Sequence, residues 1–80
     1  MSAEARLRWR ARRGTRELDA MLGWWLEARY PHADEATRAN FDALLDASDP
    51  DLWDWLTGHL VPTDPRFVPI INEIRTHHRV

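Results

Sequence analysis

The strongest constraint on the fold of this chain is the spacing of the residues that start or stop helices. Glycine commonly ends a helix, and the residue before proline avoids helical backbone. Aspartate before proline is typical of a helix start, because aspartate caps free N–H groups and proline fits the first turn. These residues are Gly14, Tyr30-Pro31, Asp49-Pro50, Gly58 and Asp64-Pro65. The chain is therefore predicted to be all-α, since no segment between them alternates apolar and polar residues as a strand would.

Five segments carry apolar residues at the spacing of a buried helix face. The predicted helices cover residues 3–13, residues 15–30, a segment capped by Asp34, a segment between the cap Asp49 and Gly58, and a segment from Asp64 to His78. Their predicted buried faces are Ala3, Leu7 and Ala11; Leu18, Met21, Leu22, Trp25 and Leu26; Phe41, Leu44 and Leu45; Leu52, Trp55 and Leu56; Phe67, Ile70, Ile71, Ile74 and His78. Arg29 follows the same helical period as the second of these faces. Pro69 either kinks the last helix or lies near its true start. We expect a compact bundle of five short helices, forming a single domain over residues 1–80.

Composition supports a folded chain and excludes several classes of protein. Apolar residues make up 44% and include five tryptophans, whereas disordered chains lack aromatic residues. The chain has no cysteine, which excludes disulfides, a thiol nucleophile and thiolate metal sites. The uncharged stretch at residues 21–26 is far too short to cross a bilayer. We therefore expect a cytoplasmic protein with no membrane partner.

Residues that could carry out catalysis or bind a metal are scarce. Ser2 and Ser48 stand in no recognisable nucleophile motif, and three isolated glycines form no phosphate loop. His77 and His78 are adjacent, so on a helix they point about 100° apart and cannot hold one ion together. The aspartates near helix starts are explained as caps. The sequence therefore predicts neither an enzyme nor a metal site.

Charge changes sign sharply at Glu17. Residues 1–16 contain six arginines and one acid, whereas residues 17–80 contain five arginines and twelve acids, for a formal net charge of -2. An arginine-rich first helix leaves open a nucleic-acid-binding module, or an antitoxin-like regulatory module. The acidic remainder argues against nucleic acid as the partner.

The segment at the sign change breaks a rule of helix electrostatics. Gly14 is explained as a helix stop, and Glu17 favours the positive end of the next helix, where it can also reach back to a free N–H. Arg16 is a cation in that same first turn, where the helix dipole disfavours it. With Arg12 and Arg13 it makes three arginines within five residues. A local rule broken without local gain points to use by a partner.

Trp9 adds weight to that interpretation. Helical spacing places it on a face with Arg6, Arg10 and Arg13. An aromatic residue among arginines has the composition of a protein–protein hot spot. The alternative is that Trp9 simply belongs to the core.

The other tryptophans and the acidic stretch have plainer interpretations. Trp25 and Trp55 fall on apolar faces and are predicted to be core, whereas Trp24 and Trp53 are either exposed or fill gaps between helices. Residues 34–54 contain seven acids and one arginine. We interpret this stretch as a solvated face with capped helix starts; the alternatives are a polyanion mimic or contact with a basic partner.

Three segments together resemble a known family. Arg13-Gly14-x-x-Glu17 resembles the RGxxE signature of the succinate dehydrogenase flavinylation factors, the bacterial SdhE type and the mitochondrial succinate dehydrogenase assembly factor 2. The preceding Ala5-Arg6-Leu7-x-Trp9 resembles their first helix. Asp49-Pro50-Asp51-Leu52-Trp53-Asp54-Trp55-Leu56 resembles their Asp-Pro-Asp-Leu-x-x-Trp-Leu segment. The resemblance spans about residues 5 to 78.

This resemblance implies a five-helix domain that acts as an assembly factor and not as an enzyme. Its partner would be the flavoprotein subunit of succinate dehydrogenase or of the related fumarate reductase. The factor would promote covalent attachment of FAD to a histidine of that subunit, by holding the flavoprotein in the geometry where histidine meets the flavin. FAD would belong to the partner, and the factor would bind no cofactor stably.

The resemblance also implies which residues bind the partner. Gly14 would let the two backbones approach closely, and Arg13 and Glu17 would make charged contacts near the flavin. The full expected set is Arg6, Trp9, Arg12, Arg13, Gly14, Arg16 and Glu17. We expect the free protein to be a monomer that binds no nucleic acid.

Overall fold

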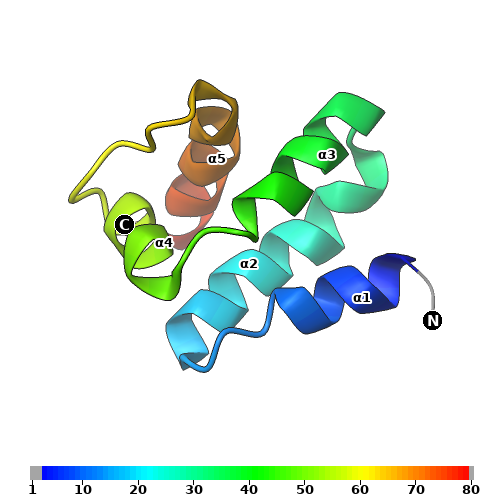
Figure 1. Ribbon diagram of the computed structural model, residues 1–80, viewed down its shortest axis with the longest axis horizontal. Helices are drawn as coiled ribbons and strands as arrows, with labels where there is room; N and C mark the ends of the chain where they lie inside the picture. The colour runs from blue at the N-terminus through cyan, green and yellow to red at the C-terminus, as the bar shows by residue number, and fades with distance from the viewer. Residues whose placement is uncertain (1–2, 80) are drawn as a thin grey trace.

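The computed structural model describes residues 3–79. Within this range the chain consists of helices joined by turns and irregular segments, with no strand (Figure 1). Five α-helices and two short 3-10 turns follow one another: α1 Ala3–Arg10, α2 Arg16–Ala28, η1 Tyr30–His32, α3 Glu35–Leu44, α4 Asp49–Leu56, η2 Pro65–Phe67 and α5 Val68–His78. The predicted all-α bundle of five short helices is confirmed.

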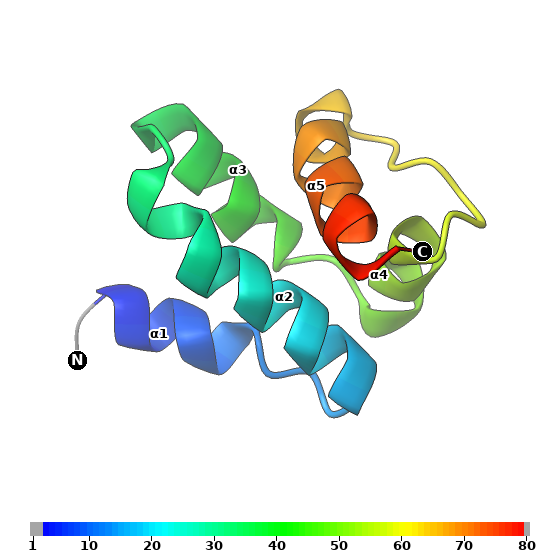
Figure 2. The same cartoon turned by 180° about the vertical axis from the view of Figure 1, so that it is seen from behind.

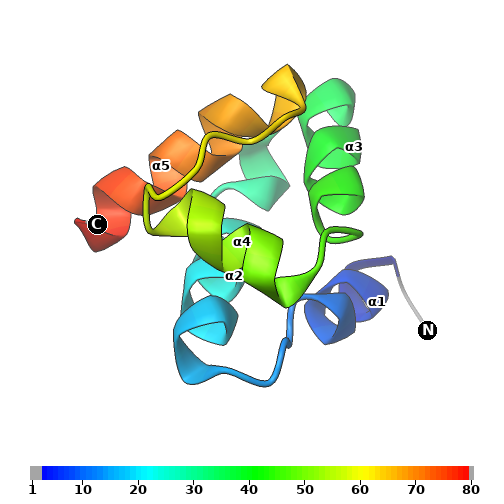
Figure 3. The same ribbon diagram turned by 60° about the vertical axis from the view of Figure 1, so that its left-hand side comes forward.

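Helix α2 lies at the centre of the bundle. It is 13 residues long, the longest of the described helices, and α1, α4 and α5 all contact it. Figure 2 shows α1 along one side of α2 and α5 on the other side. Figure 3 shows α4 beside the first half of α2, where the turn from α1 also lies. Two connections far apart in sequence, α1–α2 and α3–α4, therefore meet at one end of α2.

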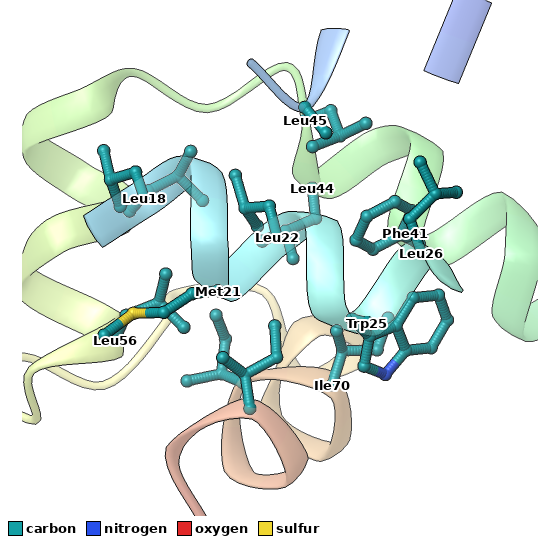
Figure 4. Packing of buried hydrophobic residues seen from close by; sticks show 14 of the residues in the cluster. Leu18, Met21, Leu22, Trp25, Leu26, Phe41, Leu44, Leu45, Leu56 and Ile70 are labelled. Atoms are coloured by element: carbon teal, nitrogen blue, oxygen red, sulfur yellow. The ribbon is translucent and has the colours of Figure 1, made fainter. Parts of the chain in front are cut away.

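The core consists of apolar side chains from every helix. Among the described residues, no polar or charged side chain is fully buried. Trp25 of α2 stacks on Phe41 of α3 with ring centroids 4.5 Å apart, at the right-hand side of the cluster drawn in Figure 4. The buried residues are Leu7, Ala11, Leu18, Met21, Leu22, Trp25, Leu26, Phe41, Leu44, Leu45, Leu52, Trp55, Leu56, Phe67, Ile70, Ile71 and Ile74.

All of these residues were predicted to be buried, and the core assignments of Trp25 and Trp55 are confirmed. His78 was predicted on the same face but is only half-buried. The predicted burial of Ala3 falls outside the described side chains. Periodicity therefore identified the core, with one error at the end of the last helix.

The first helix is shorter than predicted, because α1 ends at Arg10 instead of Arg13. The N–H of Arg12 donates to the carbonyl of Trp9 at 3.2 Å, a tightened last turn. The N–H of Arg13 then donates to the carboxylate of Asp19, in the first part of α2. The N–H of Arg13 therefore donates to the Asp19 side chain and not to a carbonyl of α1, so the helix does not continue.

The second and third helices begin as predicted. The Thr15 hydroxyl accepts from the N–H of Leu18 at 3.2 Å, and the Asp34 carboxylate accepts from the N–H of Thr37 at 2.8 Å. Helix α2 ends at Ala28, earlier than predicted, and a 3-10 turn at Tyr30–His32 follows it. The turn takes up Pro31, because proline breaks the interior of an α-helix.

The fourth helix is capped by Ser48, so the prediction that Asp49 is the cap is wrong. The Ser48 hydroxyl accepts from the N–H of Asp51 at 3.3 Å, and Asp49 is the first residue of α4. The Asp49 carboxylate instead accepts from Arg13 at 2.9 Å. The predicted stop at Gly58 is confirmed, since α4 ends just before it and Gly58 has a φ of 81°.

The last helix begins after a 3-10 turn. Asp64 accepts from the N–H of Arg66 at 3.0 Å and so caps the turn Pro65–Phe67, as its Asp-Pro pattern suggested. Helix α5 starts at Val68, which places Pro69 in its first turn, where a missing N–H costs nothing. Of the two alternatives for Pro69, the one near the true helix start is correct.

His78 is held in a site that disfavours its charged form. Its ring lies 5.9 Å from that of Trp24 and 4.9 Å from that of His77, and its Nε2 atom is buried with no hydrogen-bond partner in the described part of the chain. Burial, and secondarily repulsion from His77, hold the pKa of His78 below its ordinary value of 6.5. The unfolded chain therefore takes up this proton at a higher pH than the folded one.

We predict that stability decreases as the pH falls below about 6.5, because only the unfolded chain gains the His78 proton there. The carboxylates whose pKa is lowered, Asp34 and Asp64, start from 3.8 and affect only more acidic solutions. The thermal midpoint at pH 7.5 and pH 5.5 checks this. The decrease should be larger in the unaltered protein than in His78→Gln, and equal decreases would contradict the assignment.

Candidate functional site

Residues 12–17, here named the signature turn, comprise the end of the α1–α2 connection and the first two residues of α2, and they carry the RGxxE pattern (Figure 1). Gly14 has a φ of 93°, a backbone conformation that other residues adopt only with strain. A Cβ atom added to Gly14 would meet no atom of the described chain within 4 Å. Backbone conformation therefore explains this glycine, and the surface above it is open.

The guanidinium of Arg13 points into the molecule. Its Nε donates to the Asp49 carboxylate at 2.9 Å, and its Nη1 donates to the carbonyls of Leu45 at 3.1 Å and Arg10 at 3.2 Å. Its Nη2 donates to the carbonyl of Ala47. Only 16% of the side chain is exposed. Arg13 thus joins the signature turn to the α3–α4 connection, a structural use that sequence reasoning missed.

Arg10 makes a second link between the same parts of the fold. Its Nη2 lies 2.7 Å from the Asp46 carboxylate and 3.1 Å from the Asp42 carbonyl, and its Nη1 pairs with the Asp42 carboxylate. Exposed pairs of this kind each contribute about 0–1 kcal/mol. The acidic stretch, interpreted from sequence as a solvated face, therefore faces the first helix in part. The opposite charges of the two segments were the signal for this contact.

The remaining charged residues of the signature turn face solvent. Arg12, Arg16 and Glu17 are exposed and form no ion pair within residues 3–79. Glu17 does not make the reach-back hydrogen bond considered from sequence, since Thr15 alone caps this end of α2. Three charges therefore surround the open glycine without any use inside the described chain.

Trp9 is 72% exposed, so the alternative that it belongs to the core is wrong. It lines a groove of about 330 Å³ between α1 and α2, whose floor includes Ala11 and Leu26. Arg8 and Arg12 border the groove on one side, and Asp19 and Glu27 lie on the other.

The predicted face of Trp9 with three arginines is divided in the structure. Arg10 turns toward Asp42 of α3 and Arg13 toward Asp49 of α4, whereas Trp9 lies in the groove toward α2. Arg6 is exposed and lies beside Arg10 in a separate hollow next to α3. The arginines that line the groove with Trp9 are Arg8 and Arg12. Because α1 ends at Arg10, Arg13 lies beyond the helix and off its face.

The two tryptophans that fell off the apolar faces occupy different surroundings. Trp24 is half-buried and stacks on His77 with centroids 3.9 Å apart, so it fills a gap between α2 and α5. Trp53 is 40% exposed on α4, near the start of α2. Sequence reasoning left both alternatives open, and each tryptophan realises one of them.

The site offers charged and aromatic contacts to a partner. Within residues 3–79, no group of three or more histidine or acidic residues could hold a metal ion. In the same range, no helix combines the length and apolar character needed to cross a membrane.

Comparison with known proteins identifies the family. A sequence model of the family described as flavinator of succinate dehydrogenase matches residues 5–78. The chain belongs to this family. The match covers the same residues as the resemblance described from the sequence. The family assignment made from that resemblance is therefore confirmed.

Several bacterial relatives in this flavinator family bear the name FAD assembly factor SdhE. The relative from Xylella fastidiosa (strain 9a5c) is 46% identical over 70 residues, which cover 88% of this chain and 72% of that protein. The relative from Methylococcus capsulatus is 41% identical over 75 residues, covering 94% and 90%. That from Coxiella burnetii is 38% identical over 73 residues, covering 91% and 89%. The relatives are thus named as assembly factors and not as enzymes.

Proposed function

We propose that this protein is an assembly factor that binds the flavoprotein subunit of succinate dehydrogenase, or of fumarate reductase, and promotes covalent attachment of FAD to it. Membership of the flavinator family supports this. The observation that carries it is the signature turn, where Arg12, Arg16 and Glu17 are exposed and have no ion-pair partner among the described residues, around an open Gly14. Unpaired charge of both signs beside an exposed backbone suits a folded protein partner.

The partner-binding residues divide into two groups by their surroundings. Arg6, Trp9, Arg12, Arg16 and Glu17 are exposed and are proposed to contact the flavoprotein. Gly14 and Arg13 are proposed to contribute by shape, since Gly14 leaves room for a close approach and Arg13 holds the turn to α4. The signature would then combine direct contact with positioning.

FAD and its chemistry are proposed to belong to the partner. The covalent bond would form between the flavin and a histidine of the flavoprotein, so this chain would act by holding the reacting groups in place. We propose that the chain works as a single-domain monomer in the bacterial cytoplasm. The nucleic-acid or antitoxin-like alternative loses support, because Arg10 and Arg13 are engaged by carboxylates of the chain itself.

The function is tested by covalent flavin on the flavoprotein subunit, measured as in-gel fluorescence after denaturation. Cells lacking this protein should show a marked loss of signal. Glu17→Gln should lower the rate of flavin attachment by about tenfold, the effect of losing about 1.4 kcal/mol of contact energy. The reason is that the amide keeps the shape of the side chain but removes its charge.

Glu35→Gln is the matched control, because Glu35 is also exposed and also lies in the first turn of a helix, α3. It should retain the full signal. Equal fluorescence with and without the protein would refute the proposed function. Equal losses in the two glutamine variants would refute the role of Glu17.

A further inference from the structure

A second hollow lies beside the signature turn, on the α4 side. Thr15, Glu17 and Leu18 of the α2 start line it together with Asp49, Pro50 and Trp53 of α4, around a volume of about 340 Å³. We name it the Trp53 hollow. Its two walls come from parts of the sequence far apart, which Arg13 holds together through the Asp49 carboxylate at 2.9 Å. Its shape is therefore fixed by the same arginine that fixes the turn.

The walls of the hollow are apolar and incompletely covered. Trp53 is 40% exposed and Pro50 is also exposed, although the neighbouring Leu52 and Trp55 of α4 are buried in the core. Burying apolar surface is favourable, and tryptophan is one of the residues enriched at binding hot spots. The hollow is thus suited to an apolar group of a partner.

The charges beside the hollow indicate which charged residue of the partner would stand next to that apolar group. Glu17 borders the hollow and has no ion pair within residues 3–79, and Asp51 is exposed at the start of the same helix α4. Asp49 is already engaged by Arg13. Among the residues that line the hollow, Glu17 is therefore the charged side chain without an ion pair in the described chain, and its negative charge favours a cation and disfavours an acidic segment.

We propose that the Trp53 hollow receives an apolar side chain of the flavoprotein subunit that stands beside an arginine or lysine, with the cation paired to Glu17. This inference rests on the proposed function and adds a contact outside the signature. With this contact, the proposed binding surface runs without a break from Gly14 across Glu17 to Trp53 of α4. Trp53 is a binding residue in this arrangement, and Arg13 is a positioning residue.

The test is titration calorimetry of this protein with the purified flavoprotein subunit. Trp53→Ala should weaken the affinity about tenfold or more, whereas Trp53→Phe, which keeps an aromatic wall, should stay within about threefold of the unaltered protein. Leu60→Ala is the control, because Leu60 is 58% exposed and lies outside the hollow. It should bind as the unaltered protein does, and Trp53→Ala binding equally well would overturn the proposal.

A measurement on the unaltered chain covers the case in which Trp53→Ala does not fold. Hydroxyl-radical footprinting should show Trp53 protected when the flavoprotein subunit is added, with Leu60 unchanged. An unprotected Trp53 would overturn the proposal. If Trp53 mediated self-association instead, sedimentation would show a dimer that Trp53→Ala dissociates while affinity for the flavoprotein stays constant, and this too would overturn it.

Failure of this inference is distinguishable from failure of the proposed function. If the unaltered protein neither binds the flavoprotein subunit nor raises its covalent flavin, the proposed function is wrong and the hollow loses its partner. If the unaltered protein does both and Trp53 is neither protected nor needed for affinity, only the hollow has been assigned wrongly.

Discussion

Replacing Arg13 with alanine should lower the free energy of unfolding by about 2–3 kcal/mol. The change leaves the Asp49 carboxylate and the carbonyls of Leu45 and Ala47 without their donor, and partly buried acceptors without donors are costly. For a domain of this size the thermal midpoint should fall by about 10–20 °C. Arg13 is only 16% exposed, so solvent replaces these contacts poorly.

Arg12→Ala is the matched control for Arg13→Ala, because Arg12 is the adjacent arginine but is exposed and forms no ion pair in the described chain. Its unfolding free energy should stay within about 0.5 kcal/mol of the unaltered protein. Arg13→Lys should recover little, since an ammonium cannot reproduce the planar fork of a guanidinium. Thermal unfolding followed by circular dichroism checks all three. An Arg13→Ala protein as stable as Arg12→Ala would show that the fork contributes nothing.

Replacing Gly14 with arginine should reduce covalent flavin attachment to the level of cells without the protein. A Cβ atom at this position meets no atom of the described chain within 4 Å, so we expect the arginine to project into the space that the partner is proposed to occupy. The φ of 93° adds strain of about 1–2 kcal/mol, which a stable domain tolerates. The fold should therefore survive at 25 °C while activity is lost.

Gly14→Ala separates strain from obstruction, because alanine carries the same backbone strain with the least bulk. It should keep most of the flavin fluorescence and show the same loss of stability as Gly14→Arg. If both variants lose activity equally, backbone conformation and not the open surface explains the glycine. If both retain it, the turn is not part of the interface.

The apolar core could be predicted from sequence because helical periodicity is a local signal. Each predicted face contains apolar residues at helical spacing, and at least one of them is fully buried in each of four helices: Leu22, Phe41, Leu52 and Ile74. Helix ends were less predictable, since they depend on contacts from elsewhere. Asp49 looks like a cap, but Arg13 engages its carboxylate and Ser48 takes its place.

The position of the site in the chain could be predicted from sequence, but the separate roles of its arginines could not. Six arginines in the first sixteen residues look alike, and nothing local tells which of them face inward. Arg10 and Arg13 are distinguished only by the acids that α3 and α4 bring to them. The spacing of Asp42 and Asp46, one helical turn apart, was the available hint. The Trp53 hollow was missed because its two walls meet only in the folded chain.

The attachment of α1 has a consequence for how binding energy is distributed. Of the described side chains in and just after α1, only Leu7 and Ala11 are buried, and ion pairs supply much of the remaining contact. A segment held in this way opens more readily than the core, and higher ionic strength loosens it further. The signature turn thus connects α1, which has few buried contacts, to the central helix α2. A protein that binds across it must also order α1, so its measured affinity reports that ordering as well as the contacts.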